Sequence, residues 1–161
     1  KLVTLGKQWG YYGGMAANVG AAMATTEFIT FLDDDDVFNP GAGDIIRSKL
    51  KESKDVDVWI GGVRFPQKIR LTDQEGNLFF EGTDLATNPS RGLDMGNACM
   101  PTYRTSIFSK LPFVDDCGEH EDIIDLLHIR KCSAMGFKLD WFGDVIYLVR
   151  PNIGDSNGRG K

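Results

Sequence analysis

The sequence predicts an α/β fold, in which helices flank a sheet that contains parallel strands. Short runs of β-branched and aromatic residues alternate with Ala-rich or amphipathic segments, in the order strand, helix, strand, helix, strand. The apolar run at 28–32 then ends abruptly in four consecutive aspartates, at 33–36. Ligands of open α/β sheets bind beyond the carboxyl ends of the strands, so this acidic strand end is the first candidate for a functional site.

The composition indicates one globular domain. The chain has 161 residues, of which 42% are hydrophobic, so we expect a single domain over 1–161. Its formal net charge of −5 argues against nucleic acid as a partner, because phosphate binding normally needs a basic face. No stretch has the length and apolarity of a transmembrane helix, and 1–5 is too short for a signal peptide, so we expect a cytoplasmic protein. The three cysteines lack CxxC spacing, which favours reduced thiols over disulfides or a zinc site.

The first half of the chain alternates strand and helix signals. A Gly- and aromatic-rich loop at 6–14, able to pass close to a ligand, follows the first strand. Past Pro40, apolar residues recur at helical spacing with basic residues facing outward. The predicted elements are strands at 2–5, 28–32 and 56–63, a helix at 15–24, and a second helix that begins past Pro40 and frays at 52–54.

The second half departs from this alternation. After Pro66, two alternating segments surround 73–76, which predicts a β-hairpin inserted into the α/β pattern. Gly136 is the expected C′ residue of the last helix. The predicted elements are hairpin strands at 68–72 and 77–81, a loop at 82–94, a small-residue segment at 95–100, helices at 105–111 and 122–135, strands at 139–142 and 145–149, and a loop or lid from Pro151.

The aspartate run has two interpretations. Because side chains alternate along extended backbone, Asp33 and Asp35 share one side, and Asp34 and Asp36 share the other. Four adjacent carboxylates repel one another, which favours a divalent cation, or a phosphate bridged through one, at this strand end. The alternative is a solvated acidic turn.

A second acidic cluster, at 115–122, precedes the last predicted helix. Asp122 opens that helix, where a carboxylate is commonly a helix cap. On residue type alone, His120 and His128 are a neighbour of that cap and a helix-face side chain rather than metal ligands.

The chain resembles the family 2 glycosyltransferases of GT-A fold in three segments and in their order and spacing: 13–20, the aspartate run, and Glu121-Asp122 before an amphipathic helix. The resemblance covers nearly the whole chain. It implies a GT-A-like (Rossmann-like) mixed sheet flanked by helices, with the β-hairpin as an insertion. The strand–helix–strand unit that opens this family and binds the nucleotide base is missing, so we expect an N-terminally truncated domain with an exposed sheet edge, either self-associating as a homo-oligomer or cut from a longer protein.

The resemblance implies a metal-dependent inverting glycosyltransferase. Its donor would be a nucleotide sugar, with a UDP-sugar as the first expectation, and its acceptor a saccharide or another hydroxyl compound. Peripheral association with a membrane is compatible with this function. By the match to the family's motifs, Asp35, with Asp33 and Asp36, would bind Mn²⁺ or Mg²⁺ on the donor pyrophosphate. Asp33, Asn18 and Gly14 would contact the nucleotide. Asp122 would be the general base, and Glu121 would shape the acceptor site.

Two departures from the family pattern stand out. Ala17 occupies the position that is commonly Arg, so one basic contact is absent. The family's third metal ligand, often a His near the C-terminus, has no match, and the tail offers Arg150, Asn152 and Asp155 instead.

Two alternative functions stay open. Asp33-x-Asp35-x-Val37 after an apolar strand also fits the nucleophile motif of haloacid-dehalogenase-like phosphotransferases, although that motif normally ends the first strand of its fold and here a strand and a helix precede it. The other alternative is a glycosyltransferase-like module that binds metal or a glycan without turnover.

Overall fold

The structure is a computed structural model that describes residues 14–33, 36–72, 76, 78–85, 100–113 and 124–149. Within these ranges one mixed sheet and several helices make up the fold, which confirms the predicted α/β class. The strands are β1 (Phe28–Thr30), β2 (Val37–Phe38), β3 (Val58–Thr72), β4 (Leu78–Leu85), β5 (Met100–Arg104) and β6 (Leu139–Leu148). The helices are α1 (Gly14–Met23), α2 (Ala42–Glu52), α3 (Ile124–Ala134) and the 3₁₀ helix η3 (Thr105–Ser109).

The described strands follow the order β1-β5-β3-β6-β2, and β4 pairs with the outer part of β3. β3 and β6 are parallel neighbours, as expected for an α/β sheet. β5 is antiparallel to both β1 and β3, so β1, β3 and β6 all run in the same direction. The strands predicted at 28–32 and 56–63 therefore run in parallel, with one antiparallel strand between them.

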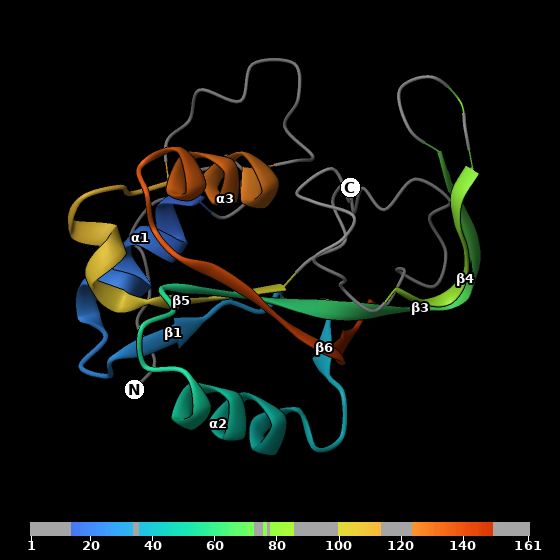
Figure 1. Ribbon diagram of the computed structural model, residues 1–161, viewed down its shortest axis with the longest axis horizontal. Coiled ribbons are helices and arrows are strands. Elements are labelled where there is room, and N and C mark those ends of the chain that lie inside the picture. The colour runs from blue at the N-terminus through green and yellow to red at the C-terminus, as the bar shows by residue number, and fades with distance from the viewer. Residues whose placement is uncertain are drawn as a thin grey trace.

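Helices cover both faces of the sheet. Figure 1 shows α2 on one face and α1 and α3 on the other. Side chains alternate along β3, so that Trp59 enters the core beside α2, whereas Val58 and Ile60 enter the core on the α1 and α3 side. These two cores join a helix layer to each face of the sheet.

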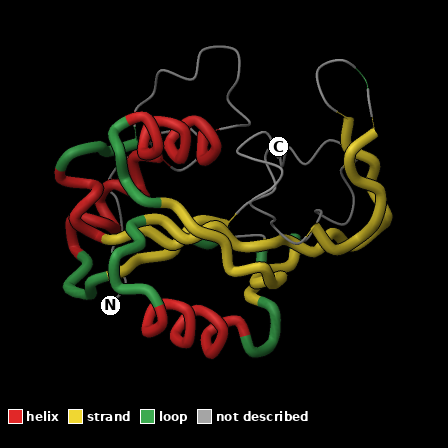
Figure 2. Tube along the Cα trace, viewed as in Figure 1, coloured by secondary structure: helices red, strands yellow, loops and turns green. Residues whose placement is uncertain are grey.

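The hairpin is confirmed, but it continues an existing strand. β3 runs without a break through Pro66, and Figure 2 shows β3 and β4 leaving the rest of the sheet as a two-stranded arm. The register shifts between Arg64 and Ile69, and such an irregularity accommodates a proline that cannot donate to the ladder. Because β4 extends to Leu85, the loop predicted at 82–94 is wrong at its start.

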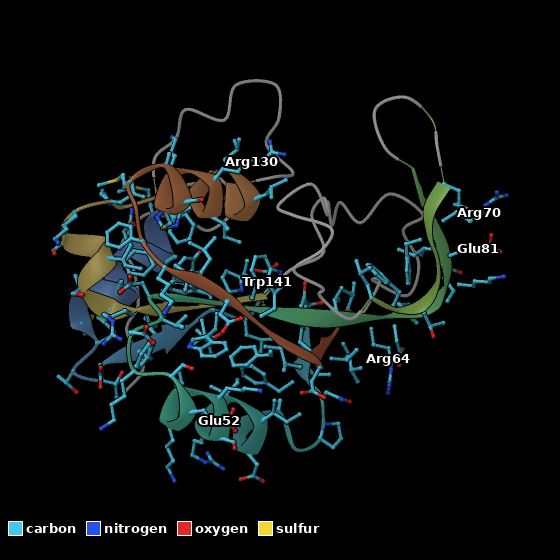
Figure 3. All side chains as sticks on the ribbon, viewed as in Figure 1. Glu52, Arg64, Arg70, Glu81, Arg130 and Trp141 are labelled. Atoms are coloured by element: carbon cyan, nitrogen blue, oxygen red, sulfur yellow. The ribbon has the colours of Figure 1, made fainter. Side chains whose placement is uncertain are left out.

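Opposite charges pair across this arm. Arg64 binds Asp84 through two hydrogen bonds of 2.7 and 2.6 Å, and Glu81 lies 2.5 Å from Lys68 and 3.5 Å from Arg70. Figure 3 shows Arg70 and Glu81 directed away from the body of the protein. Cross-strand pairs of opposite charge thus line the exposed face of the arm, whereas Phe65 on β3 and Phe80 on β4 pack against the core beside α2.

Three other boundaries differ from expectation. β2 was not predicted, and it forms because Val37 and Phe38 pair with the end of β6. The two strands predicted at 139–142 and 145–149 are one strand, β6, in which Gly143 has a φ of 78° where the register with β3 shifts. The helix predicted at 105–111 is the shorter 3₁₀ helix η3.

The C-terminal end of α3 is as predicted. Gly136 has a φ of 82°, and the Phe137 N–H donates to the Cys132 carbonyl at 3.1 Å, the six-residue bond of a Schellman cap. The predictions for 2–5, 6–13, 86–99 and the tail from Pro151 lie outside the described residues.

Candidate active site

The aspartate run connects the two edges of the described sheet. β1 and β2 stand at opposite ends of the strand order, and the run joins them. The Asp36 N–H donates to the Asp33 carbonyl at 3.2 Å, so the chain turns within the run. Asp33 is exposed and Asp36 half-buried, whereas Asp34 and Asp35 lie outside the described residues. The run thus begins where a metal-bound donor was expected, directly beyond the carboxyl end of β1.

The donor set of the run suits a hard divalent cation. Carboxylate oxygens are the ligands that Mg²⁺ and Mn²⁺ prefer, and the turn brings the Asp33 and Asp36 backbones within one hydrogen bond of each other. The part of the chain that the structure describes contains no group of three His, Cys, Asp or Glu side chains arranged for a metal, and this part leaves out Asp35. The metal assignment therefore stays a prediction.

Gly14 and Asn18, the two predicted nucleotide contacts, both lie on α1. Gly14 is buried at the first position of the helix. The Asn18 amide donates to the Phe113 carbonyl at 2.8 Å and accepts from the Phe113 N–H at 2.8 Å. The side chain of Asn18 therefore holds a distant backbone segment, and its contact with a nucleotide stays a prediction.

An aromatic cluster links this backbone segment to the aspartate run. The ring of Phe31, two residues before Asp33, packs edge-on against Phe113 and Phe108, with centroid distances of 5.7 and 5.5 Å. Phe113 thus links Asn18, which bonds its backbone, to Phe31 just after the end of β1. The structure brings together the α1 and aspartate-run segments that the sequence singled out.

The predicted acceptor-side residues, Glu121 and Asp122, lie outside the described residues, and so does His120. α3 begins two residues after Asp122, at Ile124. His128 is a side chain of α3, as the sequence indicated, and the face that carries it is buried, because His128 is 3% exposed. Figure 3 shows Trp141 on β6 between the sheet and α3, where it packs half-buried against the core on that side.

The ring of His128 is held on both nitrogens. Nε2 lies 2.9 Å from the Leu111 carbonyl, and Nδ1 lies 3.8 Å from the Cys132 Sγ. Burial lowers the pKa of His128 below its ordinary value of 6.5, against the opposing effect of the bond to Leu111. Burial also raises the pKa of the Cys132 thiol to about 12. Helical periodicity does not predict this pairing, because it depends on a partner 17 positions earlier in the chain.

A family model named "Glycosyl transferase family 2" matches residues 1–111, more than half of the chain. The chain belongs to the family 2 glycosyltransferases. The matched part runs through α1, the aspartate run, the sheet as far as β5, and η3, and the mixed sheet with its flanking helices is consistent with a GT-A-like fold. α3 and Glu121-Asp122 lie beyond the match. No curated protein matches this glycosyltransferase chain. Among the described helices, none is both long and apolar enough to cross a membrane.

Proposed function

We propose that this family 2 glycosyltransferase carries out a metal-dependent, inverting transfer of a sugar from a nucleotide-sugar donor to a hydroxyl acceptor. The observation that carries the proposal is the aspartate run, which begins at the carboxyl end of β1 inside the segment that the family model matches. A UDP-sugar is the first donor to test, and a saccharide the first acceptor. A cytoplasmic location and self-association are part of the same proposal.

On the donor side, Asp35 with Asp33 and Asp36 would hold Mn²⁺ or Mg²⁺. The ion, when bound, neutralises charge that develops on the departing diphosphate. Asp33 is exposed at the strand end, which suits a carboxylate that must reach a ligand from solvent. Gly14 and Asn18 would border the nucleotide from α1.

On the acceptor side, Asp122 would act as the general base and Glu121 would shape the pocket. The acceptor oxygen forms a bond to the anomeric carbon while the bond from that carbon to the diphosphate oxygen breaks. The Asp122 carboxylate takes the acceptor's hydroxyl proton, and the nucleoside diphosphate leaves. A single displacement of this kind inverts the anomeric centre and needs only one carboxylate base.

A non-catalytic, glycosyltransferase-like module is the second candidate. One observation favours it: the family model ends at residue 111, before the segment that would supply the base. Such a module would bind nucleotide or glycan without turnover. The two candidates share the donor side and differ only at Glu121 and Asp122.

The test measures binding and turnover of a panel of nucleotide sugars with the chain, with Mn²⁺, Mg²⁺ or EDTA. For a transferase, Asp35→Asn abolishes metal-dependent donor binding, and Asp122→Asn lowers kcat by roughly 10²-fold or more with donor affinity unchanged. Asp44→Asn is the control, because Asp44 is exposed on α2 and pairs with Arg47 on the same helix. Metal-dependent binding without turnover would establish the module, and binding unaffected by Asp35→Asn would refute the metal assignment.

A further inference from the structure

Asn18 joins α1 to the backbone of Phe113 by two directional bonds. Its side-chain amide donates to the Phe113 carbonyl and accepts from the Phe113 N–H, each at 2.8 Å. Ala17 and Ala21, on the same helix, pack against the core on this side of the sheet. Apolar contacts of that kind are non-directional, so they do not by themselves fix the position of the helix along its axis. The two hydrogen bonds do fix it, because their donors and acceptors must align.

The ring of Phe113 passes this constraint on to the end of β1. Phe113 is 5% exposed, and its ring packs edge-on against that of Phe31, with the centroids 5.7 Å apart. β1 pairs with β5 as far as Thr30, so Phe31 lies just beyond this ladder. The next residue, Leu32, is 39% exposed, so Phe31 is the apolar side chain that anchors this stretch to the core. Asp33 follows directly.

The two ends of this chain of contacts are donor-side residues of the candidate site. At one end, Gly14 lies one helical turn before Asn18 and therefore on the same face of α1. At the other end, Asp33 is exposed beyond β1. The contacts of Asn18 with Phe113, and of Phe113 with Phe31, thus relate the beginning of α1 to the first carboxylate of the aspartate run.

We infer that Asn18 is a positioning residue for the donor half of the transfer site, and that it acts through Phe113 and Phe31 to fix Asp33 relative to α1. This role is additional to the proposed nucleotide contact of Asn18. It rests on the proposed function only for its consequence for metal and donor binding. A carboxylate that is held loosely binds a metal-bound diphosphate more weakly, because ordering the carboxylate then becomes a cost of binding.

The first measurement needs no ligand. NMR compares the amide resonances of residues 31–33 in the parent, in Asn18→Ala and in Arg104→Ala. We expect Asn18→Ala to move these resonances, because Phe113 loses both backbone bonds and the ring of Phe31 follows it. Arg104→Ala is the matched control: it also removes buried polar contacts, but Arg104 pairs with Phe28 at the opposite end of β1. It should leave the resonances of 31–33 in place.

The second measurement is the affinity of the chain for UDP with Mn²⁺. We expect Asn18→Ala and Phe31→Leu each to weaken this binding by roughly 10- to 100-fold, as other groups that orient metal ligands do. Both substitutions break one chain of contacts, so the double variant should bind about as well as the weaker of the two single variants. Arg104→Ala should bind UDP and Mn²⁺ as tightly as the parent at a temperature where both are folded.

Three outcomes would overturn the inference: resonances of 31–33 that do not respond to Asn18→Ala, losses of affinity that multiply in the double variant, or an equal loss of affinity in Arg104→Ala. If Asn18→Ala does not fold, Asn18→Asp takes its place in both measurements, because it keeps the acceptor for the Phe113 N–H and removes only the donor to the carbonyl. A parent that binds neither Mn²⁺ nor UDP, with resonances of 31–33 that respond as expected, would instead refute the proposed donor site alone.

Discussion

The side-chain amide of Asn18 pairs with both backbone polar groups of Phe113, a residue 95 positions later in the chain. Such a pairing is the geometry of a β-ladder, provided here by a side chain from a helix. An Asn within an Ala-rich helix is unfavourable for the helix itself. Its presence is explained by the two backbone groups of Phe113 that it satisfies.

Asn18→Ala should therefore destabilise the fold strongly for a half-buried polar residue. It leaves the N–H and the carbonyl of Phe113 without partners, and we expect the free energy of unfolding to fall by about 2–4 kcal/mol. Asn39→Ala is the matched control, because Asn39 makes one side-chain bond, to the Val145 carbonyl at 3.1 Å. It should lose about 1 kcal/mol. Urea unfolding of both variants tests this, and equal losses of unfolding free energy would show that the second hydrogen bond of Asn18 adds nothing.

Arg104 should tolerate neither Ala nor Lys. Its guanidinium binds Glu27, Asp57 at 3.2 Å and the carbonyls of Lys54 and Val56 at 2.6 and 3.0 Å. Lys cannot reproduce this planar set of donors, so we expect both substitutions to cost about 2 kcal/mol or more. Arg47→Ala is the control, because Arg47 and Asp44 are both largely exposed, and it should leave the urea midpoint unchanged. An Arg104→Lys variant as stable as the parent would contradict this account.

Two glycine substitutions should act in opposite directions. Gly143 on β6 has a φ of 78°, so a side chain there is strained, and we expect Gly143→Ala to lose about 1–2 kcal/mol. Gly20 lies within α1, and an added Cβ there meets nothing within 4 Å. We expect Gly20→Ala to gain about 0.5–1 kcal/mol, since alanine is the better helix former. Thermal unfolding midpoints decide the prediction, and a shift of the same sign in both variants would refute it.

The sequence predicted elements well where one local pattern decided them. The helical spacing of Ile45, Ile46 and Leu50 predicted α2, and Gly136 correctly marked the end of α3. Prediction from the sequence failed where an element depends on pairing with a strand distant in the chain. β2 is two residues long and forms by pairing with β6. Pro66 resembles the end of a strand in the sequence, because the register shift that accommodates it depends on the pairing of β3 with β4.

The same distinction applies to the candidate site. A charge run after an apolar strand is a local signal, so the position of Asp33 beyond β1 was predictable. The hydrogen bonds of Asn18 and His128 were not, because each depends on backbone at 111–113 whose placement the fold as a whole determines. The assignments of Asp35, Glu121 and Asp122 stay predictions, since these residues lie outside the described ranges.

The buried thiol of Cys132 should make stability depend on alkaline pH. Burial, and after it the nearby negative charge of Asp57, raises the pKa of Cys132 from 9.0 to about 12. The unfolded chain ionises this thiol above pH 9 while the folded chain does not, so its contribution to stability is complete below pH 9 and is lost as the pH rises toward 12. Cys132→Ala should therefore show a flatter decline of the free energy of unfolding over that range than the parent. Ile129→Val, equally buried on α3, is the control: it should lose about 1 kcal/mol at every pH and keep the parent's slope. Urea unfolding at steps from pH 8 to 11 compares the slopes, and identical slopes in the parent and in Cys132→Ala would show that the thiol ionises as readily in the folded chain as in the unfolded one.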